Sequence, residues 1–210
     1  MIATGALVES IVEVGWAGMA LDGDERPIES GDHHVVVPFE RGSLVAVMDG
    51  LGHGPEAAEA SREAAEILAA HPGRPVVDLI QLCHEGLRRT RGAVMTLCSF
   101  SAVDSTLTWS GVGNVDAELF RSARSSGPRR ESISLRGGVV GYTLPPLRAW
   151  QVPVSRDDTL ILSTDGVRSG FSEGVLFHRS PQEIAQWILD GHRRKSDDAL
   201  VVVARYRGEP

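Results

Sequence analysis

The apolar positions in the first part of the chain predict strands that include a hairpin. Residues 7–16 alternate loosely between apolar and polar side chains, which is typical of a half-buried strand. Residues 33–39 and 44–48 form two further apolar runs, and the connector 40–42 between them is short enough to predict an antiparallel hairpin. The run 44–48 is continuous and bounded by turn residues, so we expect this strand to be buried on both faces.

Apolar residues that recur every third or fourth position predict helices. Residues 55–70 and 75–89 each carry such a stripe, with charged residues mainly outside it. A third helix is expected to begin after Ser180, because Ser180 and Glu183 have the spacing of a capping box. Gly191 stands where a glycine commonly ends a helix.

The rest of the chain is predicted to form mainly strands. Apolar runs separated by turn residues occupy 94–103, 106–109, 115–120, 159–163 and 199–206. If the last two runs pair antiparallel, the end of the first lies beside the start of the second. A chain of 210 residues, 42% of them hydrophobic, suffices for one well-buried domain and is short for two. We therefore expect a single domain over residues 1–210.

Charge and cysteine content narrow the class of protein. The formal net charge of −7 argues against a nucleic-acid binder, which would carry a basic face. Cys83 and Cys98 are too few and too isolated for a disulfide framework or a zinc cluster, and they fit a reducing compartment. The N-terminal residues lack a basic start and an unbroken apolar run. We therefore expect a cytoplasmic protein with no membrane partner.

Four aspartates stand at the ends of predicted strands. Asp32 comes just before the first strand of the hairpin and Asp49 just after the second, which places both carboxylates at its open end. Asp165 follows one of the last two predicted strands and Asp197 precedes the other, so antiparallel pairing brings these two together as well. We expect two strand pairs that each bring two carboxylates to one edge.

Carboxylates gathered in this way predict a metal site. Like charges in a partly dry site raise pKa values or destabilise the fold, and divalent cations remove the repulsion. A set of metal ligands that are all oxygen atoms, without Cys and without His at metal-ligand spacing, suits Mg²⁺ or Mn²⁺ rather than zinc. Two such ions about 3.5–4 Å apart can share a water, lower its pKa and neutralise a phosphoryl group under attack. The pattern therefore predicts phosphatase chemistry without a protein nucleophile.

Four motifs of the chain resemble those of a known family. They are, in order, Glu29-Ser30-Gly31-Asp32, Met48-Asp49-Gly50-Leu51-Gly52-His53-Gly54, Ser163-Thr164-Asp165-Gly166-Val167 and Ser196-Asp197-Asp198-Ala199-Leu200. Together they resemble the metal-dependent type 2C protein serine/threonine phosphatases, and most closely the SpoIIE-like bacterial branch with its small single-domain RsbX-like members. The segments 108–115 and 138–142 resemble the same subgroup, so the likeness covers nearly the whole chain.

The resemblance implies a fold and a set of metal ligands. The implied fold is an α/β (α+β) layered one, a central antiparallel β-sandwich flanked by helices on both sides (α-β-β-α). Asp49 would bridge two Mn²⁺ or Mg²⁺ ions, and the carbonyl of Gly50 would be a further ligand. Asp165 and Asp197 would hold the first ion, and Asp32 the second. These four aspartates are the expected catalytic residues.

Residues next to these ligands are expected to act indirectly or not at all. Asp197 and Asp198 cannot both reach one ion without a distortion of the backbone, because successive side chains of an extended segment point to opposite faces. The resemblance implies that Asp197 is the direct ligand and that Asp198 hydrogen-bonds the site. His53 orients a water or a substrate, or else caps a turn. Asn114 is expected to be a left-handed turn residue. The basic run 193–195 is expected to be a solvated charge run, and the phosphate-binding arginine of the eukaryotic branch has no evident counterpart.

A competing motif is the spacing of Cys83 and Arg89, which matches the Cys-five-residues-Arg pattern of cysteine phosphatases. That chemistry needs the thiol at a strand end that opens onto a helix N-terminus, where its pKa is lowered. Here Cys83 falls on the apolar stripe of a predicted helix. We expect it to be a buried structural residue.

The leading hypothesis is a metal-dependent phosphatase that removes phosphate from serine or threonine of a bacterial stress-signalling regulator. The resemblance implies a phosphorylated protein partner, with a STAS-type regulator as the expected substrate. The alternative is a catalytically silent scaffold with the same fold that binds a regulatory protein. All the proposed acidic ligands are present, which argues against the scaffold, since a binding module does not need them.

Overall fold

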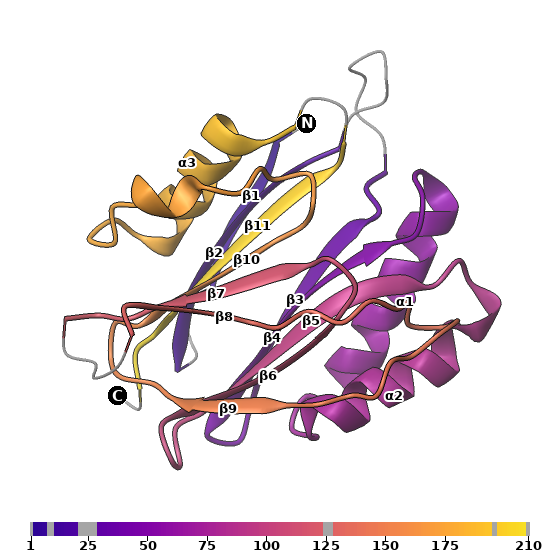
Figure 1. The fold of residues 1–210 in the computed structure, drawn as a ribbon, viewed down its shortest axis with the longest axis horizontal. Coiled ribbons are helices and arrows are strands. Elements are labelled where there is room, and N and C mark those ends of the chain that lie inside the picture. Colours follow the sequence, from indigo (N-terminus) through magenta and orange to yellow (C-terminus); the bar gives the residue numbers. More distant parts are fainter. Residues whose placement is uncertain (1, 8–10, 21–28, 124–127, 195–196, 209–210) are drawn as a thin grey trace.

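Two antiparallel sheets lie face to face within the described part of the chain, with helices outside them (Figure 1). The structure, a computed structural model, describes residues 2–7, 11–20, 29–123, 128–194 and 197–208. One sheet, called here the β11 sheet, has the strand order β1-β2-β11-β10-β7-β8. Its strands are β1 (Ile2–Leu7), β2 (Val12–Met19), β11 (Ala199–Tyr206), β10 (Thr159–Ser163), β7 (Asp116–Phe120) and β8 (Arg130–Ser132).

The other sheet, called here the β4 sheet, has the strand order β3-β4-β5-β6-β9. Its strands are β3 (Asp32–Phe39), β4 (Gly42–Gly50), β5 (Ala93–Ser101), β6 (Thr106–Val112) and β9 (Trp150–Pro153). Strands β3 and β4 pair antiparallel around the predicted short connector, so the hairpin is confirmed.

Helices cover the outer face of each sheet (Figure 1). Helix α1 (Pro55–Ala70) and helix α2 (Val76–Gly86), followed by the short 3-10 turn η1 (Leu87–Arg89), lie on the β4 sheet. Helix α3 (Pro181–His192) and the 3-10 turn η2 (Phe171–Glu173) lie on the β11 sheet. The predicted layered α-β-β-α fold is confirmed.

The sequence of β4 explains why it lies at the centre of these layers. Its side chains alternate between two cores: Val45 and Val47 face the β11 sheet, while Leu44, Ala46 and Met48 face α1 and α2. All five are fully buried. A strand covered on both faces needs an unbroken apolar run, and the prediction of a doubly buried strand is confirmed.

Several predicted boundaries are wrong. Residues 7–16 do not form one strand, because the chain forms the two paired strands β1 and β2 there. The helix predicted over 75–89 ends at Gly86, and the apolar pattern does not predict β9. Gly191 does not terminate α3: it lies inside the helix, does not have a positive φ, and the cap is Arg193.

Other predictions hold closely. Helix α1 spans the predicted residues 55–70, and β11 spans 199–206. The capping box of α3 is present, since the Ser180 hydroxyl accepts a hydrogen bond from the Glu183 amide and the Glu183 carboxylate accepts one from the Ser180 amide. No helix within the described ranges has the length and apolar character needed to span a membrane.

Candidate active site

Asp32 and Asp49 face each other directly at the open end of the β3–β4 hairpin. The strand register pairs these two residues, one at the start of β3 and the other near the end of β4. The amide of Gly50 donates a hydrogen bond of 3.0 Å to the carbonyl of Gly31, which extends the pairing past the strand. The expected juxtaposition of the first two carboxylates is confirmed.

The second pair of strands brings Asp165 to the same region. Strand β10 pairs antiparallel with β11, and the Thr164 amide continues the ladder with a hydrogen bond of 3.1 Å to the Leu200 carbonyl. The Thr164 hydroxyl accepts a hydrogen bond from the Leu200 amide and donates one of 2.7 Å to Oδ2 of Asp32. This hydroxyl therefore joins the carboxylate end of the β4 sheet to that of the β11 sheet.

Asp197 and Asp198 have different surroundings, as the alternation of side chains predicts. Oδ2 of Asp198 accepts hydrogen bonds from the Ser30 hydroxyl (3.0 Å) and from the Gly31 amide (2.8 Å). Asp197 is exposed, and its Oδ1 accepts a hydrogen bond of 3.0 Å from the Asp198 amide. Asp198 thus ties the start of β11 to the segment before β3, and Asp197 is left facing solvent. Ser196 and Lys195 lie outside the described residues.

The glycine after each central aspartate allows close packing of the backbone. A Cβ atom at Gly50 would collide with the backbone of Ala57 in the first turn of α1. A Cβ atom at Gly166 would collide with the carbonyl of Asp198. Any larger residue would therefore separate Asp49 from α1, or Asp165 from the start of β11. This steric requirement accounts for the Asp-Gly pairs of both motifs.

The site carboxylates repel one another. Burial raises the pKa of Asp49 to about 7, and the charges of Asp165, Asp197 and Asp198 add to the increase. Burial also raises the pKa of Asp32 well above its usual value, with a further contribution from Asp49, while the hydrogen bond from Thr164 opposes the increase. Such mutual effects require that the carboxylates lie near one another in a partly dry site.

Asn114 is a residue of this site that the sequence interpretation missed. Its side-chain amide donates a hydrogen bond of 2.6 Å to Oδ2 of Asp165. The expectation of a left-handed conformation is wrong, because the positive φ of 99° belongs to the preceding Gly113. The only sequence signal at Asn114 is a Gly-Asn pair before a predicted strand. Such a pair is equally compatible with a turn and with a site residue.

The aspartates do not form a complete cation site as they stand. Within the described ranges, no three His, Cys, Asp or Glu side chains converge closely enough to hold a metal ion. Oxygens of Asp32, Asp165 and Asp198 are instead occupied by the hydrogen bonds described above. The ligand set Asp32, Asp49, Gly50, Asp165 and Asp197 therefore stays a prediction.

Two further candidate residues, His53 and Cys83, make no hydrogen bond to these carboxylates in the described part of the chain. His53 is exposed and has no hydrogen-bond partner in the described part of the chain, so its role stays a prediction. Cys83 is fully buried in α2, and its Sγ lies 3.9 Å from the Ala64 carbonyl. Burial raises the pKa of this thiol to about 12, which is the opposite of what a nucleophilic cysteine needs.

Comparison with known proteins decides the family. The model of the family described as stage II sporulation protein E (SpoIIE) matches residues 40–207. The chain belongs to the SpoIIE family. The matched SpoIIE region runs from β4, which contains Asp49, to the end of β11. It therefore includes Asp165, Asp197 and Asp198.

Individual relatives agree with this SpoIIE assignment. The phosphoserine phosphatase RsbX of Bacillus subtilis (strain 168) is 27% identical over 181 residues, which cover 83% of this chain and 86% of RsbX. A chain solved in work on the bacterial stressosome, a modular system adapted to control secondary messenger signalling, is 30% identical with a TM-score of 0.82. That similarity covers 92% of this chain and 99% of the other.

A crystal structure of RsbX in complex with magnesium has the same fold, with a TM-score of 0.81 at 19% identity over 98% of this chain and 99% of RsbX. The predicted resemblance to SpoIIE-like and RsbX-like proteins is confirmed, and so is the predicted class of enzyme, a protein phosphatase.

Proposed function

We propose that this chain hydrolyses phosphoserine or phosphothreonine on a regulatory protein of bacterial stress signalling, with divalent cations as cofactors. The observation that carries the proposal is the meeting of two aspartate-bearing strand pairs at one end of the sandwich. The paired residues Asp32 and Asp49 lie on one sheet, and the Thr164 hydroxyl links Asp32 to the segment after β10 that contains Asp165.

The chemistry of these side chains fits divalent cations. Buried carboxylates that raise one another's pKa are stabilised by positive charge, and oxygen-only donors favour Mg²⁺ or Mn²⁺. We propose that Asp32, Asp49, Asp165 and Asp197 hold two such ions together with the carbonyl of Gly50. When bound, the ions supply a nucleophile from water at neutral pH and neutralise charge on the phosphoryl group.

The protein's own contribution is to hold the carboxylates in place. Thr164 fixes one oxygen of Asp32, and Asn114 fixes one oxygen of Asp165. Ser30 and Gly31 hold Asp198, which lies next to Asp197 in the segment just before β11. Partners that orient metal ligands in this way typically affect metal affinity or activity by about 10–100-fold.

The proposed substrate is a phosphorylated regulator with a STAS-type fold. The relative from Bacillus subtilis is named a phosphoserine phosphatase, and another relative was solved in work on the bacterial stressosome. Both support a protein substrate within stress signalling. His53, exposed in the loop between Asp49 and α1, is proposed to orient a water or the substrate there.

The test is phosphate release from a phosphorylated STAS domain, measured with Mn²⁺, with Mg²⁺ and after treatment with EDTA. Asp49→Asn is the matched inactive variant, since it keeps the size of the side chain. We expect release that depends on the cation and is lost in the variant. Binding of the phosphoprotein without turnover would favour the silent scaffold instead, and full activity in a thoroughly stripped sample would contradict the role of the cations.

A further inference from the structure

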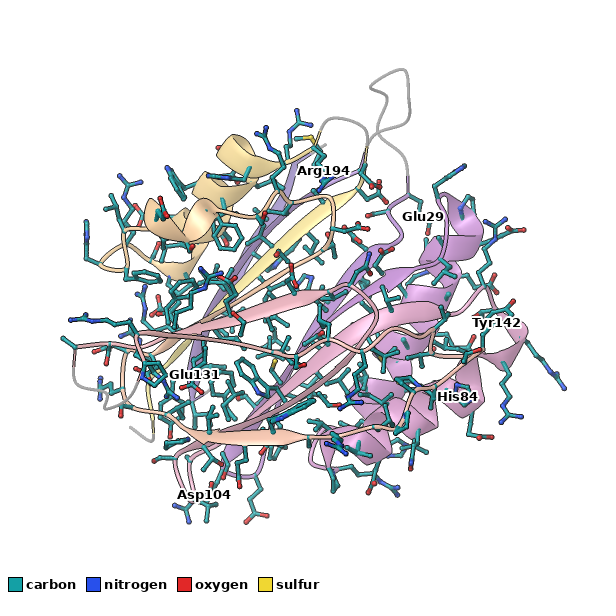
Figure 2. All side chains as sticks on the ribbon, viewed as in Figure 1. Glu29, His84, Asp104, Glu131, Tyr142 and Arg194 are labelled. Atoms are coloured by element: carbon teal, nitrogen blue, oxygen red, sulfur yellow. The ribbon has the colours of Figure 1, made fainter. Side chains whose placement is uncertain are left out.

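Arg194 is a cation at the rim of the candidate site. Its side chain is exposed and makes no hydrogen bond or ion pair with the residues that the structure describes. On the side of the β4 sheet, by contrast, Arg62 forms an ion pair with Glu29, and Arg91 forms one with Glu56. Figure 2 shows Arg194 and Glu29 at the same end of the molecule, on opposite layers.

The backbone holds Arg194 close to Asp165. Its amide donates a hydrogen bond of 2.7 Å to the carbonyl of Gly166, the residue after Asp165. An antiparallel bridge between Val167 and Arg193 continues this contact. The segment that leaves α3 is therefore fixed against the segment that leaves β10, and the position of Arg194 does not depend on its own side chain.

The charge of Arg194 acts on the carboxylate of Asp165. Partial desolvation and the charge of Asp197 raise the pKa of Asp165, whereas Arg194 and the hydrogen bond from Asn114 oppose the increase. Asp32 and Asp49 experience no comparable effect from any cation in the described part of the chain. The backbone bond to Gly166 thus holds Arg194 beside the segment that contains Asp165.

We propose that Arg194 binds the phosphate group of the substrate. The inference rests on the proposed function and names a residue for a role that the sequence left without a candidate. A guanidinium group offers several N–H donors in a planar fork that matches phosphate oxygens, and such charge-assisted bonds are stronger than neutral ones. Because no described residue pairs with this side chain, its donors are available for a phosphate monoester beside Asp165.

A purely electrostatic role is the alternative, in which Arg194 only offsets repulsion among the aspartates. The two roles predict different effects of removing the charge. An offsetting cation also repels Mg²⁺ or Mn²⁺, so its loss would tighten cation binding and leave phosphate affinity unchanged. A phosphate-binding arginine would lower phosphate affinity when removed, without weakening the binding of the cations.

The experiment compares Arg194→Ala and Arg194→Lys with the matched control Arg193→Ala, which removes the same charge one residue earlier. Inorganic phosphate is titrated calorimetrically into the full chain in the presence of Mg²⁺, and Mg²⁺ binding is measured separately without phosphate. We expect Arg194→Ala to weaken phosphate binding by roughly 10- to 100-fold, the range for hydrogen bonds to charged groups. Arg194→Lys should retain part of the affinity as a point charge, and the control should resemble wild type.

Hydrolysis of p-nitrophenyl phosphate gives a second measurement, in which kcat/KM of Arg194→Ala should fall by a similar factor. Unchanged phosphate affinity in Arg194→Ala, equal losses in both alanine variants, or no phosphate binding by the wild-type chain would each overturn the proposal. Failure of the wild-type chain to hydrolyse phosphate esters would contradict the proposed function instead. The phosphate titration needs no turnover and still tests Arg194 in that case.

Discussion

The side-chain amide of Asn114 donates a hydrogen bond of 2.6 Å to the carboxylate of Asp165, which lies 51 residues later in the chain. Asn114 precedes β7 and Asp165 follows β10, and these two strands pair antiparallel in the β11 sheet, so the bond continues their pairing beyond the strand ends. Asp165 also interacts with the backbone amide of Gly166, so two neighbouring groups hold its carboxylate. An amide in this position fixes the carboxylate without adding negative charge to a site that already has an excess of it.

The Asn114→Ala variant tests whether this bond orients Asp165. Loss of the donor frees the carboxylate to rotate, so we expect Mn²⁺ binding and turnover to fall by about 10- to 100-fold. The measurement is a Mn²⁺ titration of activity together with calorimetric binding. Asn114 is exposed, so the unfolding midpoint without metal should change little, and a large drop there would attribute the loss to folding rather than to the site.

Asp197 and Asp198 are neighbours for which we expect unequal effects. Asp197→Asn removes charge from a proposed ligand and should nearly abolish Mn²⁺-dependent turnover. Asp198→Asn keeps an oxygen that can accept the hydrogen bonds of Ser30 and Gly31, so activity should fall only about 10–100-fold. Metal titrations of both variants decide the question. Equal losses would contradict the unequal roles, and the reverse order would mean that Asp198 and not Asp197 is the ligand.

The stability of the metal-free protein should fall as the pH rises from about 4 to about 7. The pKa of Asp49 is raised from its usual 3.8 to about 7, so the folded state binds this proton more tightly than the unfolded state. The resulting stabilisation is complete below the unfolded pKa and is lost as the pH passes the folded pKa. Its size is on the order of 2 kcal/mol, after allowance for partial exposure and coupling to other groups.

Urea unfolding in EDTA at several pH values, for wild type and Asp49→Asn, measures this effect. The difference between the two proteins isolates Asp49 from other groups such as His34, whose pKa burial lowers to about 4. The variant should be the more stable protein at pH 8 without metal, and Mn²⁺ should reverse the order. A pH-independent difference would show that the pKa of Asp49 is not raised in the folded protein.

The Cys83→Ser variant separates a structural thiol from a catalytic one. A hydroxyl on the fully buried face of α2 should lower the free energy of unfolding by about 1–3 kcal/mol. Turnover of p-nitrophenyl phosphate should stay within a few-fold of wild type. Cys98→Ser, buried in the core between the sheets, is the matched control and should behave alike. A loss of several orders of magnitude in Cys83→Ser alone would revive the thiol mechanism.

Local sequence patterns were sufficient to predict the helices and strands whose apolar residues follow a clear pattern. The stripe of small apolar residues at 55–70 and the β-branched run at 199–206 match α1 and β11 residue for residue. The short connector 40–42 also determined that β3 and β4 pair, and this pairing alone places Asp32 beside Asp49. These inferences succeed because spacing and loop length act over a few neighbouring residues.

Weak local signals failed where tertiary contacts override them. Strand β9 has only a short, partly exposed sequence, and it forms because its edge pairs with β6. Gly191 continues α3 because a glycine ends a helix only where the chain needs a left-handed turn, and here the chain leaves through Arg193 in an extended conformation. Neither outcome can be read from the residues alone.

The sequence also determined which residue types could form the site, since four aspartates at strand ends already predict a cluster of carboxylates. Only the tertiary structure decided how these carboxylates are held and what lies beside them. The hydroxyl of Thr164 on Asp32, the amide of Asn114 on Asp165 and the charge of Arg194 come from segments far apart in the chain. Their contacts depend on how two sheets and a helix pack together, and no spacing along the sequence encodes that distance.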